Sequence, residues 1–369
     1  MKHAKKILFA AALCACLSLT GCSSKVDLPE STGSQAATSG TTVTEITSAE
    51  TQITTDQAKS HSDIQNPLTG EYDYNEAAVG KRPIAIMINN ISQSLPQYGI
   101  GSADYIYEVV VEGGITRMMG VFADYTNIPN VCSIRSCRYY YPIIAYGLDA
   151  IYCHWGMDKT IAAETLDRLD IDRFDGDDSA YYGSLFYNDE ERLMNYDREH
   201  TGYIAGSEIP AAIERAGYRT DLSEDEKHNL FDFNTEEAPI SPSGTSCTEL
   251  NVIFSDSYYS TFTFDSESGT YLKQHSGDPQ IDATTGNQLA FTNVFVLRTT
   301  VSPRGVGQLM DVELSSGTGY YVSNGMAQEI NWSKPAENQN FVITDTSGNP
   351  IKVNRGKCYF GITDNVSLG

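Results

Sequence analysis

After its first 21 residues, the chain has no apolar run approaching the length of a membrane-spanning helix, which needs about 20 consecutive apolar residues. Basic residues are also scarce, because 25 Lys and Arg stand against 48 Asp and Glu, for a formal net charge of −23. So acidic a chain repels the phosphate backbone of nucleic acids. We therefore exclude nucleic acid as a partner.

Signature motifs of common hydrolases and nucleotide-binding proteins are missing as well. The chain shows no Gly-rich phosphate loop, no His-Glu-x-x-His, no Gly-x-Ser-x-Gly and no Ser-x-x-Lys in a suitable setting. The acidic run over residues 170–178 breaks the EF-hand spacing, since Phe174 stands at the fifth position. We predict a solvated acidic loop there rather than a calcium site, and neither a cofactor nor a bound metal.

Cysteine is less abundant than the count of eight suggests. Cys14 and Cys16 lie in the N-terminal segment of residues 1–21, and Cys22 directly follows this segment. An odd number remains, namely Cys132, Cys137, Cys153, Cys247 and Cys358. A chain this long buries a sufficient core without disulfides. Export would permit one disulfide in the 132–153 region, and Cys132, Cys137, Cys153 and His154 are zinc-ligand types, although their spacing matches no familiar zinc pattern.

The N-terminus has the features of a secretory signal. Lys2, Lys5 and Lys6 precede a short apolar run over residues 7–19, which is too short to span a membrane. The run ends in Leu19-Thr20-Gly21-Cys22, which is similar to a bacterial lipobox. We predict cleavage of residues 1–21, lipid on Cys22 and anchorage at the outer face of the bacterial cytoplasmic membrane. Cleavage removes three lysines and no acid, so the net charge falls to −26.

The rest of the chain divides by composition. Residues 22–65 are rich in Ser, Thr, Gly, Ala and Gln, which predicts a disordered tether with a reach of about 35–40 Å. Residues 66–220 interleave apolar runs at 84–88, 105–111, 115–123 and 149–155 with helical patterns that begin near Asp158 and Ser207. This order predicts a mixed α/β domain.

The second half has a different pattern. Residues 221–246 are polar and predict a linker, and residues 247–369 carry short alternating runs separated by glycine turns. Ser323-Asn324-Gly325 predicts a tight hairpin, and residues 347–350 predict another turn. We therefore expect a mostly β domain over 247–369.

Charged residues around Gly113-Gly114 form the first candidate site. If these glycines are a two-residue hairpin loop, Val110 faces Arg117, and Glu108, Glu112 and Arg117 project from one face. Such a set is either a structural ion network or a holder for an anion-binding arginine.

The segment from Arg135 through Ser136 to Arg138 is the second candidate. Guanidinium groups match phosphate and carboxylate, so two arginines in an acidic chain favour an anionic ligand. The tyrosines at 139–141 supply either a surface for sugar rings or core. His154, where a strand is expected to end, and His200 are further candidates, each of which is more often a loop or core histidine.

These motifs together resemble the YerB-like lipoproteins. The resemblance rests on the lipobox, Asn66-Pro-Leu-Thr-Gly, Arg82-Pro-Ile-Ala-Ile-Met-Ile-Asn-Asn, Ala103-Asp-Tyr-Ile-Tyr-Glu, Val111-Glu-Gly-Gly-Ile-Thr-Arg, the arginine segment, the 187–200 stretch, Asp282-Ala-Thr-Thr-Gly and Asn354-Arg-Gly-Lys. It implies a domain pair of unknown function. The chain departs from the pattern at Cys132-Ser133, where the family has Gly-Pro, at Cys137, and in the loop before His200, which lacks Pro-His-Asn.

The leading hypothesis is an envelope lipoprotein that binds an anionic wall ligand or partner through the Arg135/Arg138 region, with no enzyme activity expected. Peptidoglycan, teichoic acid and polyprenyl phosphates are the candidate ligands. A looser similarity to the LytR-CpsA-Psr ligases implies an alternative, an enzyme for polyprenyl-pyrophosphate-linked glycan with His154 or Glu112 as base. A third hypothesis is an assembly factor that binds envelope proteins through residues 247–369.

Overall fold

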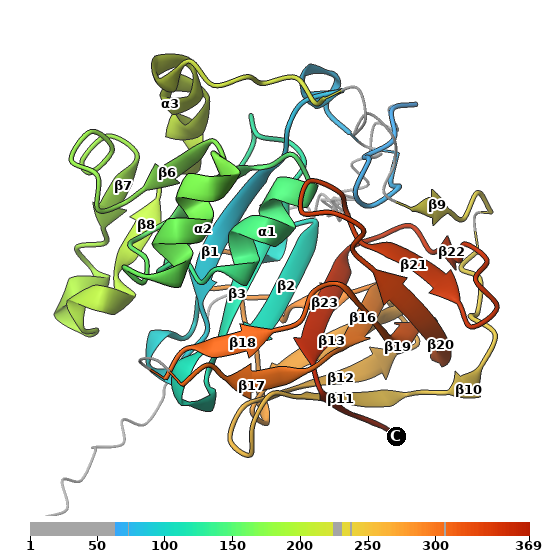
Figure 1. Cartoon of the computed structure of the whole chain (residues 1–369). Helices are drawn as coiled ribbons and strands as arrows, with labels where there is room; N and C mark the ends of the chain where they lie inside the picture. Colours follow the sequence, from blue (N-terminus) through green and yellow to red (C-terminus); the bar gives the residue numbers. More distant parts are fainter. Residues whose placement is uncertain (1–62, 73, 224–230, 237, 306–307) are drawn as a thin grey trace, which may run out of the picture. The chain divides into compact units, whose positions relative to one another are not determined.

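The mixed order of strands and helices expected for residues 66–220 is present in the computed structural model, which describes residues 63–72, 74–223, 231–236, 238–305 and 308–369 (Figure 1). These residues belong to one compact unit covering residues 58–369. The signal segment, Cys22 and nearly all of the expected tether lie outside the described residues. Strands and helices mix up to residue 220 and strands dominate afterwards, which confirms the expected fold class.

Three α-helices lie in the first half of the described chain: α1 (Tyr140–Gly147), α2 (Ile161–Leu169) and α3 (Ile209–Ala216). The start of α2 follows from Asp158, whose carboxylate accepts from the backbone N–H groups of Thr160 and Ala162 at 3.2 and 3.1 Å. Pro210 in the first turn and Gly217 with φ +69° after the last turn delimit α3, as the sequence predicts. Helix α1 was not expected.

A large mixed sheet runs through both halves of the described chain (Figure 1). Its strands, in spatial order, are β10 (Thr245–Ser246), β20 (Met326–Ser333), β19 (Ser316–Ser323), β16 (Asn293–Arg298), β23 (Cys358–Thr363), β2 (Tyr105–Val110), β3 (Thr116–Phe122), β1 (Ile84–Asn89), β5 (Ile151–His154) and β6 (Arg173–Asp175), with β21 (Val342–Asp345) beside β20. Strand β23 pairs in parallel with β2 on one side and β16 on the other. The last part of the chain thus completes the sheet that the first part begins.

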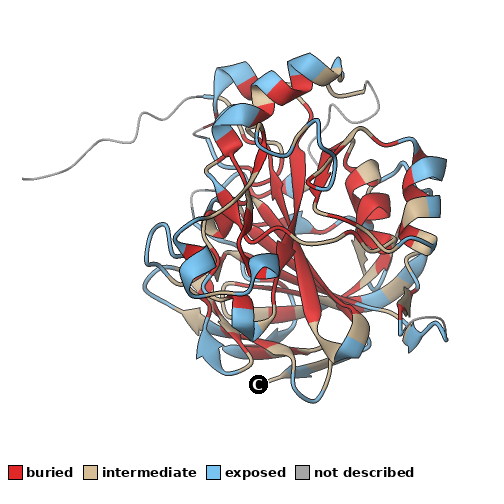
Figure 2. Ribbon diagram, turned by 90° about the vertical axis from the view of Figure 1, so that its left-hand side faces the viewer, coloured by how far each residue is buried: buried red, intermediate tan, exposed pale blue. Residues whose placement is uncertain are grey.

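Alternation along β1 shows how this sheet is covered on both faces. Ala85 and Met87 pack into the cluster that contains the apolar residues of α1 and α2. Ile84, Ile86 and Ile88 point the other way, into a second cluster with α3 and a second sheet. Every residue of β1 is buried, as expected of a strand covered on both faces. Figure 2 shows buried strands running through the interior of the molecule.

The remaining strands form smaller sheets. The second sheet has the order β14 (Asp278–Pro279), β13 (Thr270–His275), β12 (Tyr259–Asp265), β11 (Glu249–Ile253) and β24 (Asn365–Leu368), with β15 (Ala290–Phe291) on β13. Three minor sheets join β17 (Val301–Pro303) to β18 (Met310–Val312), β22 (Lys352–Val353) to β9 (Asp232–Phe233), and β4 (Val131–Cys132) through β8 (Gly202–Ile204) to β7 (Phe186–Asn188). The Asn324-Gly325 turn closes the β19–β20 hairpin as predicted, since Ser323 pairs with Met326.

The predicted register of the β2–β3 hairpin is wrong by one residue. Val111 N–H donates to the Ile115 carbonyl at 2.8 Å, so Glu112, Gly113 and Gly114 form a three-residue loop. Both glycines have positive φ, at +70° and +74°, which L side chains rarely adopt. Arg117 therefore faces Val109 rather than Val110. A slip of one residue reverses the face of every side chain, so Glu108 and Arg117 do not share one.

Candidate functional site

Strands β1, β5 and β6 run parallel, so their carboxyl ends lie at one edge of the sheet. Beyond Ile86 and Cys153 the strands β1 and β5 separate, and residues 134–136 enter between them. Arg135 N–H donates to the Met87 carbonyl at 3.2 Å, and Trp155 N–H donates to the Arg135 carbonyl at 3.1 Å. Open α/β sheets bind ligands at such a crevice outside the carboxyl ends of their strands.

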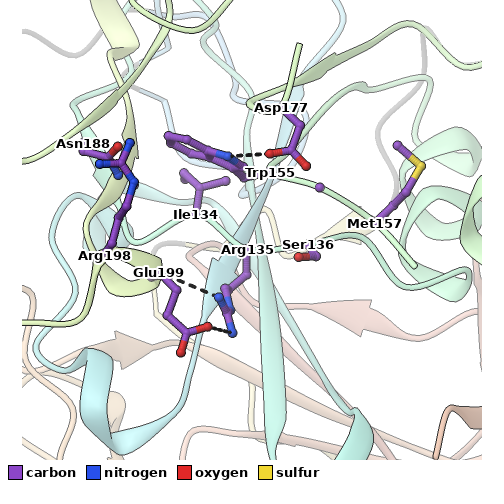
Figure 3. A pocket seen from close by; sticks show the side chains of 11 residues that line it. Ile134, Arg135, Ser136, Trp155, Met157, Asp177, Asn188, Arg198 and Glu199 are labelled. Carbon is purple, nitrogen blue, oxygen red and sulfur yellow. Dashed lines mark hydrogen bonds and ion pairs between the residues drawn. The ribbon is translucent and has the colours of Figure 1, made fainter. Parts of the chain in front are cut away.

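A hollow of about 440 Å³ lies at this edge, and we call it the Arg135 pocket (Figure 3). Its lining comes from residues 134–136, from the chain that follows β5 and β6, and from the β7–β8 region. The lining residues are Ile134, Arg135, Ser136, Trp155, Gly156, Met157, Asp177, Asn188, Arg198, Glu199 and Gly202. Its volume lies within the range of small-molecule sites. The acidic run contributes Asp177, whose Oδ1 accepts from the Trp155 indole N–H at 3.0 Å.

Two of the predicted residues, Arg135 and Ser136, line the pocket. The Arg135 side chain is about one-fifth exposed, and its Nη2 lies 2.9 Å from a carboxylate oxygen of Glu199. Glu199 is more than half exposed, so solvent screens this ion pair and leaves Arg135 open to an anion.

Arg117 and Arg138 do not line the pocket, but their guanidinium groups bond to the adjacent backbone, Arg117 at Ser136 and Arg138 at Cys137. Arg138 Nε donates to Glu112 at 2.7 Å, and its guanidinium holds the pKa of Glu112 below its ordinary value although burial raises it. Arg117 Nη1 donates to the Ser136 carbonyl at 2.6 Å. Among the described residues, no carboxylate lies within 4 Å of the Arg117 guanidinium. Burial, then repulsion from Arg138 and Arg135, lowers the pKa of Arg117 to about 10. Three arginines are therefore crowded at this edge.

The structure separates Glu108 from this group. Its carboxylate is buried and accepts hydrogen bonds from Asn90, Thr116, Ser260 and Tyr359, and it lies 3.3 Å from the ammonium of Lys273. The predicted set of Glu108, Glu112 and Arg117 on one face is thus divided. Glu112 pairs with Arg138, and Glu108 belongs to the interior between the two large sheets.

Neither candidate histidine lines the Arg135 pocket. His154 is buried, and its Nδ1 lies 2.9 Å from the Gly156 carbonyl, so Nδ1 carries the proton and Nε2 is an unpartnered acceptor within the described structure. Burial lowers its pKa, which favours the neutral ring. His200 is buried against Asn89, with Nδ1 3.1 Å from the amide nitrogen, and burial lowers its pKa too.

The tyrosines that follow the arginine segment belong to the core. Tyr140 and Tyr141 are buried in α1, and their hydroxyls donate to the Val110 and Arg117 carbonyls at 2.6 and 2.5 Å. The aromatic side chain at the pocket is Trp155, which sequence reasoning passed over in favour of its neighbour His154. Trp155 directly follows the end of β5, and this position could have identified it as a candidate. The lining residues from the β7–β8 region have no sequence feature that would have identified them.

Cysteines do not contribute to the site. Cys132, Cys137 and Cys153 are buried free thiols. Within the described ranges, no group of three or more His, Cys, Asp or Glu side chains is placed to hold a metal ion. None of the helices described is long and apolar enough to cross a membrane.

Two family models match the two halves of the chain. Residues 68–219 match the family described as "Protein of unknown function (DUF3048) N-terminal domain", and residues 250–360 match its C-terminal domain. The chain belongs to this family.

One relative and one solved structure are similar to most of the chain. "Putative lipoprotein YerB" of Bacillus subtilis (strain 168) is 26% identical over 283 residues, which are 73% of this chain and 78% of that protein. The crystal structure of YerB protein from Bacillus subtilis is similar with a TM-score of 0.72, 23% identity and coverage of 83% of this chain and 99% of that chain. The latter likeness shows the fold.

Proposed function

We propose that this protein is a lipid-anchored lipoprotein of the bacterial cell envelope that binds an anionic wall ligand at the Arg135 pocket. The sequence Leu19-Thr20-Gly21-Cys22 and the name of the Bacillus subtilis relative support the anchor. The acyl chains on Cys22 would hold the protein at the outer face of the cytoplasmic membrane.

The crowding of three arginines at the pocket edge is the observation that carries ligand binding. Arg135 lines the hollow, while Arg117, which bonds to the Ser136 carbonyl, is buried without a carboxylate partner in the described part of the chain. Placing like charges together in an acidic protein costs free energy that an anionic ligand would offset. Phosphate and carboxylate groups of wall polymers are anions of the size that a guanidinium pairs with.

Palmitate labelling tests the anchor. In a bacterial host that acylates lipoproteins, the full chain should incorporate labelled palmitate, and the Cys22→Ala variant should not, because the thiol that receives the diacylglyceryl group is removed. Label on the variant would contradict a lipid anchor at Cys22.

Thermal shift tests the ligand site. The chain from residue 22, carrying Cys22→Ser, is titrated with pyrophosphate, glycerol-phosphate polymer and muropeptides. Stabilisation follows mass action and reaches about 2.7 kcal/mol at a hundred times Kd. Arg135→Gln/Arg138→Gln should abolish the shift. Arg168→Gln/Arg304→Gln, which removes two arginines of exposed ion pairs, should retain it. Loss in both variants, or in neither, would contradict the assignment.

A further inference from the structure

Trp155 is fixed in one orientation at the Arg135 pocket. Its indole N–H is bonded to Asp177, and Phe186 packs edge-on at 5.8 Å. Gly176 and Gly202 lie against the ring so closely that a Cβ on either would be 2.5 or 2.7 Å from indole atoms. The absence of side chains at these two glycines thus makes room for the ring, and the indole lines the hollow (Figure 3). A rigid aromatic surface at a cavity binds apolar ligand faces with little loss of entropy.

Polar groups surround this aromatic surface. Asp177 and Glu199 are carboxylates that accept hydrogen bonds, Asn188 can both donate and accept, and the Ser136 hydroxyl does the same. Asn188 is half-buried; its Nδ2 donates to the Thr201 hydroxyl at 3.0 Å, and its Oδ1 accepts from the Tyr182 hydroxyl at 3.3 Å. A pyranose ring has the matching chemistry, since it carries an apolar C–H face and hydroxyl groups around its edge.

The same hollow contains two cations. Arg135 is paired with Glu199, whereas Arg198 has no carboxylate within 4 Å among the described residues. The Arg198 guanidinium donates to the Tyr182 hydroxyl at 3.3 Å, and both side chains are exposed. Arg198 is therefore free to pair with an acidic group on a bound ring.

We propose that the Arg135 pocket binds an acidic saccharide. A pyranose ring stacks on Trp155, its hydroxyls bond to Asp177 and Asn188, and its carboxylate or phosphate substituent pairs with Arg198 and Arg135. This inference rests on the anion site of the proposed function and names its ligand class. The volume of about 440 Å³ suits one or two sugar rings rather than a protein segment.

The chain offers a direct reporter, because Trp155 and Trp332 are its two tryptophans. Trp332 is buried, and its indole N–H is bonded to the Arg298 and Thr318 carbonyls. In the Trp332→Phe variant of the full chain from residue 22, with Cys22→Ser, emission reports on Trp155. The probes are N-acetylmuramic acid (carboxylate), glucose 1-phosphate (phosphate), glucose (no charge) and inorganic phosphate (no ring).

The expected result is a saturable change in Trp155 emission with one or both acidic sugars, and the stronger of the two identifies the substituent. Arg198→Gln should weaken that binding about tenfold, since a charge-assisted hydrogen bond is lost. Arg168→Gln, which replaces an exposed arginine that pairs with Glu337 and does not line the pocket, should leave it unchanged. Because Arg198 is exposed, its substitution should not affect folding, which circular dichroism verifies.

Other outcomes distinguish this inference from the proposed function. Thermal stabilisation by inorganic phosphate, with no response of Trp155 to any sugar, would overturn the saccharide assignment and leave the anion site standing. Equal binding of glucose and glucose 1-phosphate would overturn the acidic requirement. Failure of every probe in both assays, together with no response to glycerol-phosphate polymer or muropeptides, would overturn both proposals.

Discussion

Glu108 shows how burial decides what a charged residue does. Burial raises its pKa, but attraction to Lys273 and hydrogen bonds from Thr116 and Tyr359 hold it below the ordinary value. Lys273 is also fully buried, and its Nζ donates to Gln280 at 2.6 Å. This buried pair joins β2 of the large sheet to β13 of the second sheet, which gives Glu108 a structural role.

Removing one member of this pair should be costly. Glu108→Gln leaves the Lys273 charge buried without its partner, for which we expect a loss of about 3–5 kcal/mol in the free energy of unfolding. Urea denaturation measures it. Glu108→Gln/Lys273→Met removes both charges and should recover much of the loss. A cost below about 1 kcal/mol for the single variant would contradict the pairing.

His275 should make stability depend on pH. Burial, then repulsion from Lys273, lowers its pKa from 6.5 to about 4, although Glu108 and Asp278 oppose this shift. Between these values the unfolded chain binds the proton and the folded chain does not, so stability falls as pH decreases from about 6.5 to about 4. His275→Gln should reduce this slope in urea denaturation at pH 7 and pH 5. An unchanged slope would contradict a neutral buried ring.

At the scale of elements, the loop between β2 and β3 shows both the reach and the limit of sequence reasoning. Two adjacent glycines correctly predict a hairpin. They do not tell a two-residue loop from the observed three-residue loop over 112–114, because both conformations use glycine at positive φ. Tertiary contacts choose between them, including the Ser255 hydroxyl, which donates to the Gly114 carbonyl at 2.7 Å.

The two glycines should respond differently to alanine. A Cβ at Gly113 would meet nothing within 4 Å, so Gly113→Ala carries only the strain of its positive φ, roughly 1 kcal/mol. A Cβ at Gly114 would lie 3.1 Å from the Ser255 Cβ, so Gly114→Ala should cost about 1 kcal/mol more. Thermal unfolding of the two variants compares them. Equal losses would contradict the docking of this loop on Ser255.

The helices differ in whether neighbouring residues in the sequence predict them. Helices α2 and α3 carry their own start and stop residues, so the sequence predicts both. Helix α1 begins in Tyr140-Tyr141-Pro142, a run without an amphipathic stripe, because nearly all its residues are buried. The Arg135 pocket combines residues more than 60 positions apart, such as Arg135 and Glu199. Sequence reasoning identified Arg135 and Ser136 in the lining of the pocket and missed the lining residues from the β7–β8 region.

At the scale of the whole molecule, the large sheet connects regions that composition separates. The change of pattern near residue 220 predicts two domains, and the two family matches fall on either side of it. Yet β23, from the end of the chain, lies between β2 and β16 and pairs with both. Unfolding of one half would expose the hydrogen-bonding edge and the apolar faces of the other.

We therefore expect both halves to unfold together. Trp155 reports on the first half and Trp332 on the second, so Trp332→Phe and Trp155→Phe each leave one reporter. Each variant is unfolded in urea and followed by both fluorescence and far-ultraviolet circular dichroism. Because the two probes are compared within one variant, any change in stability caused by the substitution affects both equally. Coincident transitions are expected within each variant. A fluorescence transition separated from the circular dichroism transition would show that the halves unfold independently.

We propose above all that the Arg135 pocket is the ligand site of this protein. A crystal structure of the chain with glucose 1-phosphate tests it most directly. We predict a sugar ring on Trp155 with its phosphate against Arg135 or Arg198. Density for the ligand elsewhere, for example in the hollow of about 360 Å³ between Asp282 and Lys357, with an empty Arg135 pocket, would contradict the claim.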